Sequence, residues 1–123
     1  MTRARLCLGQ RGEQLAANKL LALGCKIVEH NFRCPAGEID LVTRRGDLWV
    51  FVEVRTRRGE SFGTPEQSIT ARKKRRLIAA AQTYLQEHDL TDVDWRIDVV
   101  AVGLSAKGEL LRVEVIENAV NEQ

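Results

Sequence analysis

The sequence has little of what stabilises small secreted domains or builds transition-metal sites. It contains only three cysteines, Cys7, Cys25 and Cys34, with no C-x-x-C pair, and two histidines. These residues form no zinc-ligand spacing, and an odd number of thiols is typical of a reducing cytoplasm. No apolar run approaches the length of a membrane span, and the short apolar stretch near Leu8 is broken too early for a signal peptide. We therefore expect a cytoplasmic protein with no membrane partner.

The charge is unevenly distributed along a chain whose size suits one domain. The 123 residues carry a formal net charge of +2, but residues 1–76 hold 16 Lys and Arg against 8 Asp and Glu. Residues 77–123 hold 3 against 9. Such clustering favours a polyanionic partner, although the basic run at residues 72–76 alone fits a solvated helix face equally well. The candidate nucleic-acid-binding residues are Arg57, Arg58, Arg72, Lys73 and Arg76.

Hydrophobic periodicity predicts an α/β domain with the element order αβββαββ, a mixed sheet flanked by helices. We expect helices at Leu8–Leu23 and from Ser68 or Thr70 to about His88. The expected strands are Cys25–Arg33, a hairpin over Gly37–Val54, Arg96–Gly103 and Leu110–Ile116, with a loop over Arg55–Gln67. In the second helix, the expected buried stripe is Leu77, Ile78, Ala81, Tyr84 and Leu85.

The first helix carries an acid where an apolar residue is expected. Glu13 shares one helical face with Ala16, Ala17, Leu20 and Leu23, at spacings that repeat every three or four residues. That face packs inward, and Gly24 is a natural C-terminal cap. Glu13 is therefore a candidate functional residue.

The hairpin brings two further acids together. A Gly46-Asp47 turn of type II′ pairs Arg45 with Leu48, and the same register sets Asp40 opposite Glu53. A register slip of two residues would leave both acids on the same face, and a slip of one would move them into the core, which the alternation of the strands forbids. The two acids therefore share a face. The opposite face is almost wholly apolar: Ile39, Leu41, Thr43, Leu48, Val50, Val52 and Val54.

Facing carboxylates are costly unless a positive charge lies between them. A divalent cation such as Mg²⁺ would supply it, with Arg55 on the same strand face near a bound phosphate, an arrangement suited to phosphodiester hydrolysis. Surface ion pairs from Arg44 and Arg55 are the alternative. Asp98 is either a further acid near this site or the partner of Arg96.

The segments GEIDLV and FVEVRTR resemble the strand motif of the PD-(D/E)xK nucleases, which have the restriction-endonuclease-like fold. The closer resemblance is to the YraN-like uncharacterised bacterial family, similar in turn to archaeal Holliday junction resolvases. It rests on four blocks in order: GQRGEQLAANKLLALG, the hairpin, FGTPEQSIT and RKKRRLIAAAQTYL.

The resemblance implies catalytic roles for Glu13, Asp40, Glu53 and Arg55. Asp40 and Glu53 would be the ligands of Mg²⁺ or Mn²⁺, and Glu13, as a supporting acid, would converge with them on the cation. Arg55 stands where the motif has Lys, and an Arg cannot give up a proton near neutral pH. The implied function is a nuclease acting on structured or branched DNA, for which a homodimer is common. The alternative is a non-catalytic nucleic-acid-binding or accessory protein with the same fold.

Overall fold

The computed structural model describes residues 3–59 and 69–121, with side chains from residue 9 onwards. In chain order the elements are α1 (Arg3–Ala22), β1 (Lys26–Cys34), β2 (Gly37–Arg45), β3 (Leu48–Arg58), α2 (Ala71–Glu87), β4 (Trp95–Leu104) and β5 (Leu110–Val120). The strands form one sheet in the order β1-β2-β3-β4-β5, in which only the β3–β4 pair is parallel. The predicted α/β class, mixed sheet and αβββαββ order are confirmed.

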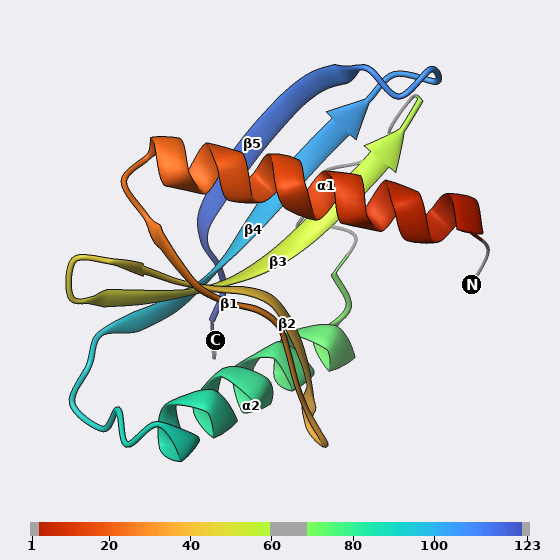
Figure 1. Cartoon of the computed structure of the whole chain (residues 1–123). Helices are drawn as coiled ribbons and strands as arrows, with labels where there is room; N and C mark the ends of the chain where they lie inside the picture. The colour runs from red at the N-terminus through yellow and green to blue at the C-terminus, as the bar shows by residue number, and fades with distance from the viewer. Residues whose placement is uncertain (1–2, 60–68, 122–123) are drawn as a thin grey trace.

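The two helices cover opposite faces of the sheet, as alternate residues of the central strands show. In Figure 1, α1 lies across β3, β4 and β5, and α2 lies beneath the curled ends of β1 and β2. Val50 and Val52 pack on the α1 side with Leu20, whereas Phe51 packs on the α2 side with Tyr84. Both faces of β3 are therefore buried, which explains its nearly continuous apolar sequence.

Of the seven residues expected on the apolar face of the hairpin, Leu48 and Val54 are partly buried and the others are fully buried. Ile39 is an exception to the expected single face, because it packs in the cluster on the α2 side. Ile39, Leu41, Val50 and Val52 are no more than 1% exposed, and Val54 is partly buried. In α2 the stripe is buried as expected, except that Ile78 is partly buried and Ala80 takes part instead.

The helix ends follow the expected caps. Gly24 adopts φ +90°, a conformation that favours glycine, two residues after α1 ends. At the start of α2, the Thr70 side chain accepts a 3.1 Å hydrogen bond from the Lys73 backbone N–H. Ser68, the other cap candidate, lies outside the described residues. Leu23, expected on the buried face of α1, is 41% exposed because the helix ends at Ala22. Neither described helix combines the length and apolar character needed to cross a membrane.

The third strand is longer than the sequence pattern indicates. We expected a loop from Arg55, but β3 continues to Arg58 because β4 pairs with it in parallel as far as Leu104. Arg55 and Arg57 are therefore strand residues with fixed directions. The remainder of the expected loop, from residue 60 to 67, lies outside the described residues.

The sheet divides where β2 leaves β3, a feature we call the fork. The β2–β3 ladder runs from Arg45↔Leu48 to Leu41↔Val52, which confirms the expected register and the turn at Gly46, where φ is +61°. Beyond that pair, β2 stays with β1 and β3 stays with β4. Figure 1 shows the ends of β1 and β2 bending towards α2 while β3 continues under α1.

Close packing of α1 on β3 gives a first prediction. A Cβ added at Gly12 would come within 3.0 Å of the Thr56 Cβ, whereas at Gly9 it would meet no described atom within 4 Å. We expect Gly12→Ala to lower the free energy of unfolding by about 1–3 kcal/mol through overpacking. Gly9→Ala should raise it by up to about 1 kcal/mol through helix propensity. Urea denaturation measures both, and equal effects of the two substitutions would contradict the close approach at Gly12.

Candidate functional site

The fork places Asp40 and Glu53 side by side on separating strands. Because the β2–β3 ladder ends at Leu41, the Val54 N–H has no backbone acceptor on β2, and it donates instead to Asp40 Oδ2 at 2.7 Å. The Asp40 carboxylate thus takes the place of a ladder hydrogen bond. This contact fixes the acid at the point where the strands part.

Glu53 is more deeply buried than Asp40, and its carboxylate contacts a lysine of α2. Its residue is only 6% exposed, and Lys73 Nζ of α2 lies 3.2 Å from Glu53 Oε2. Within the described residues that oxygen accepts no well-aligned hydrogen bond, so the Lys73 ammonium acts as a counter-charge. Sequence reasoning placed Lys73 only on a polyanion surface. Its helix packs against β2, which no local pattern reveals.

The Asp40–Glu53 pair is electrostatically unfavourable as it stands. Burial, a hydrogen bond to Glu53 and the charge of Glu53 together raise the pKa of Asp40 to about 8, against an opposing contribution from the Val54 N–H. The charge of Glu13 raises it further. At neutral pH the Asp40 carboxyl therefore keeps its proton, and it would release that proton when a divalent cation takes its place.

Glu13 reaches the same region from α1. Burial and the nearby charge of Glu38 raise the pKa of Glu13, while a hydrogen bond with the Asn31 side chain lowers it. Asn31 holds φ +53° within β1, a conformation that residues other than glycine rarely adopt. We did not single out Asn31 from the sequence, although an asparagine inside a strand is itself a signal, because asparagine is disfavoured there.

Glu13, Asp40 and Glu53 line one cleft of about 330 Å³. Its lining consists of Gly9, Glu13, Asp40, Glu53, Val54, Arg55, Thr56 and Arg57. We call it the carboxylate cleft. All four predicted catalytic residues meet in it, three as acids and Arg55 as a cation. Arg57, predicted as a nucleic-acid contact, lies there too.

The donors of the cleft suit a hard divalent cation, with one correction. Among the described residues, no three His, Cys, Asp or Glu side chains form a group able to hold a metal ion, so Glu13 does not complete a three-acid site with the other two. Its carboxylate is turned to Asn31 instead. Asp40 and Glu53 remain, and Mg²⁺ commonly uses one or two carboxylates with water and phosphate oxygens. The buried Glu53 oxygen without a hydrogen bond fits that requirement.

The other predicted basic residues do not form one surface with the cleft. Lys73 and Arg76 line a separate hollow of about 300 Å³ together with Arg33, which the sequence analysis did not single out. Arg58 lies beside Gly108 of the β4–β5 turn, and Arg72 is exposed on α2.

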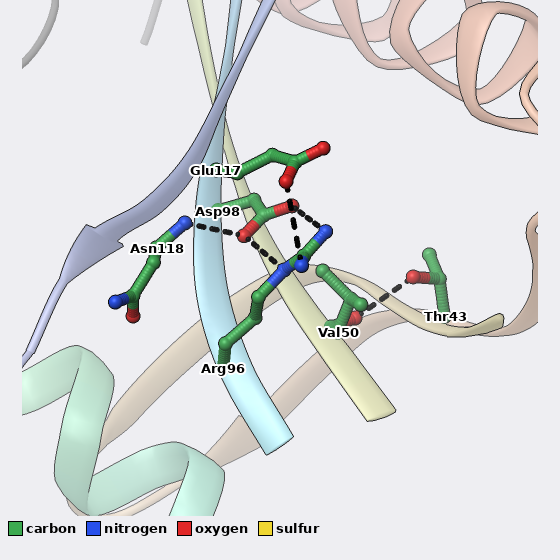
Figure 2. Close-up of polar contacts among 6 residues, drawn as sticks. All are labelled: Thr43, Val50, Arg96, Asp98, Glu117 and Asn118. Carbon is green, nitrogen blue, oxygen red and sulfur yellow. Dashed lines mark hydrogen bonds and ion pairs between the residues drawn. The ribbon is translucent and has the colours of Figure 1, made fainter. Parts of the chain in front are cut away.

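Asp98 proves to be the partner of Arg96, the second of the two alternatives. Figure 2 shows the network: Arg96 Nε donates to Asp98 at 2.9 Å, the Asn118 amide donates to it at 2.8 Å, and Glu117 lies 3.4 Å from the guanidinium. Burial raises the pKa of Asp98, although the bonds from Asn118 and Arg96 oppose the rise. This acid ties β5 to β4 at an irregularity in their pairing.

Comparison with known proteins gives a consistent family match. A model of the uncharacterised protein family UPF0102 matches residues 12–102. A UPF0102 protein of Pelotomaculum thermopropionicum is 47% identical over 119 residues, 97% of this chain and 99% of the relative. One from Roseiflexus castenholzii is 47% identical over 124 residues, 99% of each chain.

Among solved structures, Pyrococcus furiosus SfsA in complex with Ca²⁺ is similar at a TM-score of 0.40 and 14% identity. The match covers 93% of this chain and 63% of that one. At this distance the likeness supports no inference about the site.

The contrast between Asp40 and Asp98 gives a second prediction. The folded protein holds a proton on Asp40 up to about pH 8, whereas the unfolded chain releases it near pH 3.8. That contribution to stability is fully present below pH 3.8 and is lost as the pH rises to about 8. The slope is at most about 1.4 kcal/mol per pH unit, and partial exposure of Asp40 lowers it.

We therefore expect Asp40→Asn to stabilise the metal-free protein at pH 9 and to remove this slope, because an amide still accepts the Val54 N–H bond. Asp98→Asn should destabilise it by about 1–3 kcal/mol, because an amide nitrogen cannot accept from Arg96. Denaturant titrations at pH 5, 7 and 9 compare the two variants. Destabilisation by Asp40→Asn at pH 9 would mean that the pair is not under strain.

Proposed function

The chain belongs to the uncharacterised protein family UPF0102, and from its carboxylate cleft we propose that it is a divalent-cation-dependent nuclease acting on DNA. The observation that carries the proposal is the contact of Asp40 with Glu53 at the fork, where burial and then this contact raise the pKa of Asp40 to about 8. Two buried acids in contact destabilise a fold unless a ligand uses them. Basic residues beside the pair favour an anionic substrate.

Asp40 and Glu53 would hold Mg²⁺ or Mn²⁺ through carboxylate oxygens. When bound, such a cation supplies charge that stabilises the phosphodiester transition state and lowers the pKa of the attacking water. Hard oxygen donors without cysteine or histidine agree with these two cations rather than with zinc.

The chain's own groups account for orientation and charge. The Val54 N–H fixes Asp40 at 2.7 Å, so the acid does not need to reorganise when the substrate arrives. Arg55 lies in the cleft two residues beyond Glu53 and would donate hydrogen bonds to a phosphoryl oxygen. As a guanidinium it would not take up a proton, so it stabilises charge and does not serve as a general base. Glu13 adds negative charge on the α1 side.

Branched or otherwise structured DNA is the proposed substrate, because the motif blocks resemble those of Holliday junction resolvases. A homodimer and a cytoplasmic location remain part of the same proposal. The basic excess of residues 1–76 supports an anionic partner of either nucleic-acid type.

A second candidate is a non-catalytic nucleic-acid-binding or accessory protein of a DNA-processing assembly. The Lys73–Glu53 ion pair favours it, because an internal cation at 3.2 Å already neutralises one acid of the pair. Arg at the motif's Lys position points the same way. In this case the cleft would bind a phosphate without hydrolysing it.

The third prediction separates these two functions. We expect isothermal titration calorimetry to detect Mn²⁺ or Mg²⁺ binding by the wild-type chain, and cleavage assays to show hydrolysis of four-way-junction, duplex or single-stranded DNA. Asp40→Asn and Glu53→Gln should abolish cation binding and lower cleavage by about 100-fold or more. Asp47→Asn, at an exposed acid of the β2–β3 turn, is the matched control and should change neither. If the wild-type protein bound no cation even with DNA present, the nuclease proposal would be wrong.

A further inference from the structure

We propose that the hollow between the β1–β2 turn and α2 is a second phosphate-binding subsite, which holds the nucleic-acid backbone next to the carboxylate cleft. It is lined by Arg33, Lys73 and Arg76, and we call it the basic groove. We further propose that Lys73 passes from Glu53 to this phosphate when a divalent cation occupies the acids. Both statements rest on the proposed function, since they name where the same substrate continues.

The composition of the basic groove suits a phosphodiester. Three cationic side chains line a hollow of about 300 Å³, against one acid, Glu38. The Arg33–Glu38 contact is 3.5 Å long between side chains that are 75% and 40% exposed. Exposed pairs of this kind contribute little, so Glu38 does not neutralise the groove. The net positive charge of the groove therefore attracts an anion.

The groove is held in shape by direct contact between the β1–β2 turn and α2. Arg76 Nε donates to the Ala36 carbonyl at 3.2 Å, which uses one of the five N–H groups of the guanidinium. A Cβ on Gly37 would lie 3.1 Å from the Arg76 carbonyl oxygen, so the two backbones approach closely. Arg76 is therefore oriented before any ligand arrives, which lowers the entropy cost of binding.

The charge at the start of α2 is unfavourable without an anion. The helix begins at Ala71 with no acid in its first turn, while Arg72, Lys73 and Lys74 crowd the end where the helix dipole is positive. Cations stabilise the opposite end of a helix, so this arrangement costs stability in the free protein. A phosphate in the basic groove would remove that cost. The basic first turn of α2 and the cationic lining of the groove together favour a polyanion as the ligand.

Lys73 connects the basic groove to the carboxylate cleft. Its side chain lines the groove, and its ammonium lies 3.2 Å from Glu53, whose side chain lines the cleft. Glu53 cannot pair fully with Lys73 and also hold a divalent cation, because the two cations would repel each other at such a distance. The Lys73 side chain is 38% exposed, and its flexible four-carbon stem would let the ammonium turn to the groove. Cation binding and backbone binding are then coupled through this one side chain.

The fourth prediction tests the groove with fluorescein-labelled junction and duplex DNA, measured by fluorescence anisotropy over a range of NaCl concentrations with EDTA present. The double variant Arg33→Gln, Arg76→Gln should reduce the slope of log affinity against log salt by about two units. Arg112→Gln is the matched control, since this exposed arginine of β5 pairs with Glu114 away from the groove and should leave the slope unchanged.

Two results would overturn the inference in distinguishable ways. Wild-type binding with an unchanged slope in the double variant would refute the basic groove and leave the proposed function standing. Absence of DNA binding by the wild-type chain at every salt concentration would refute both.

Lys73 is tested by the same anisotropy titrations and, separately, by Mn²⁺ calorimetry with neither DNA nor EDTA present. Lys73→Gln should lower the salt slope by about one unit when Mn²⁺ replaces EDTA in the DNA titration, and should leave it unchanged with EDTA, where Lys73 stays paired with Glu53. The variant should also bind Mn²⁺ more tightly than the wild type, because Glu53 loses its competing counter-charge. Lys73→Arg should keep the slope and the weaker Mn²⁺ affinity. A merely structural lysine would not produce these opposite movements. Unchanged or weakened Mn²⁺ binding by Lys73→Gln would show that Lys73 is not shared, and circular dichroism confirms that each variant is folded.

Discussion

The hydrogen bond from the Val54 amide to Asp40 is the contact on which the site depends. It forms because the β2–β3 ladder ends at the Leu41↔Val52 pair, so the buried N–H of Val54 must find another acceptor. A carboxylate in that position must stand close to Glu53, the next residue inward on β3. The same backbone geometry that divides the sheet therefore produces the electrostatic strain between the two acids.

The fork also explains how helices on opposite faces of the sheet act on one site. Glu13 of α1 and Lys73 of α2 both approach the Asp40–Glu53 pair, because the sheet no longer separates them where β2 bends away. One helix contributes negative charge and the other positive charge. In the free protein the Lys73 ammonium lies against Glu53 and the raised pKa of Asp40 favours its protonated form; in the proposed function a divalent cation would replace both.

Much of this arrangement follows from local patterns. Residue alternation and the Gly46 turn were sufficient for the hairpin register and for the shared position of Asp40 and Glu53, and Thr70 and Gly24 marked the helix ends. The fork itself was not predictable, because strand separation depends on the curl of β1 and β2 towards α2. For the same reason the sequence did not predict the Lys73–Glu53 ion pair or the hydrogen bond between the Glu13 and Asn31 side chains. They join elements that are distant in the sequence.

The most direct test of the account is the titration of the Asp40 carboxyl carbon by NMR in the metal-free protein. The account predicts an apparent pKa of about 8, well above the ordinary 3.8, and a fall in that pKa when Mg²⁺ is added. The fall is expected because a bound cation favours the ionised carboxylate. A titration near pH 4 that does not respond to Mg²⁺ would contradict it, since Asp40 would then be an ordinary solvated acid with no strain for a ligand to relieve.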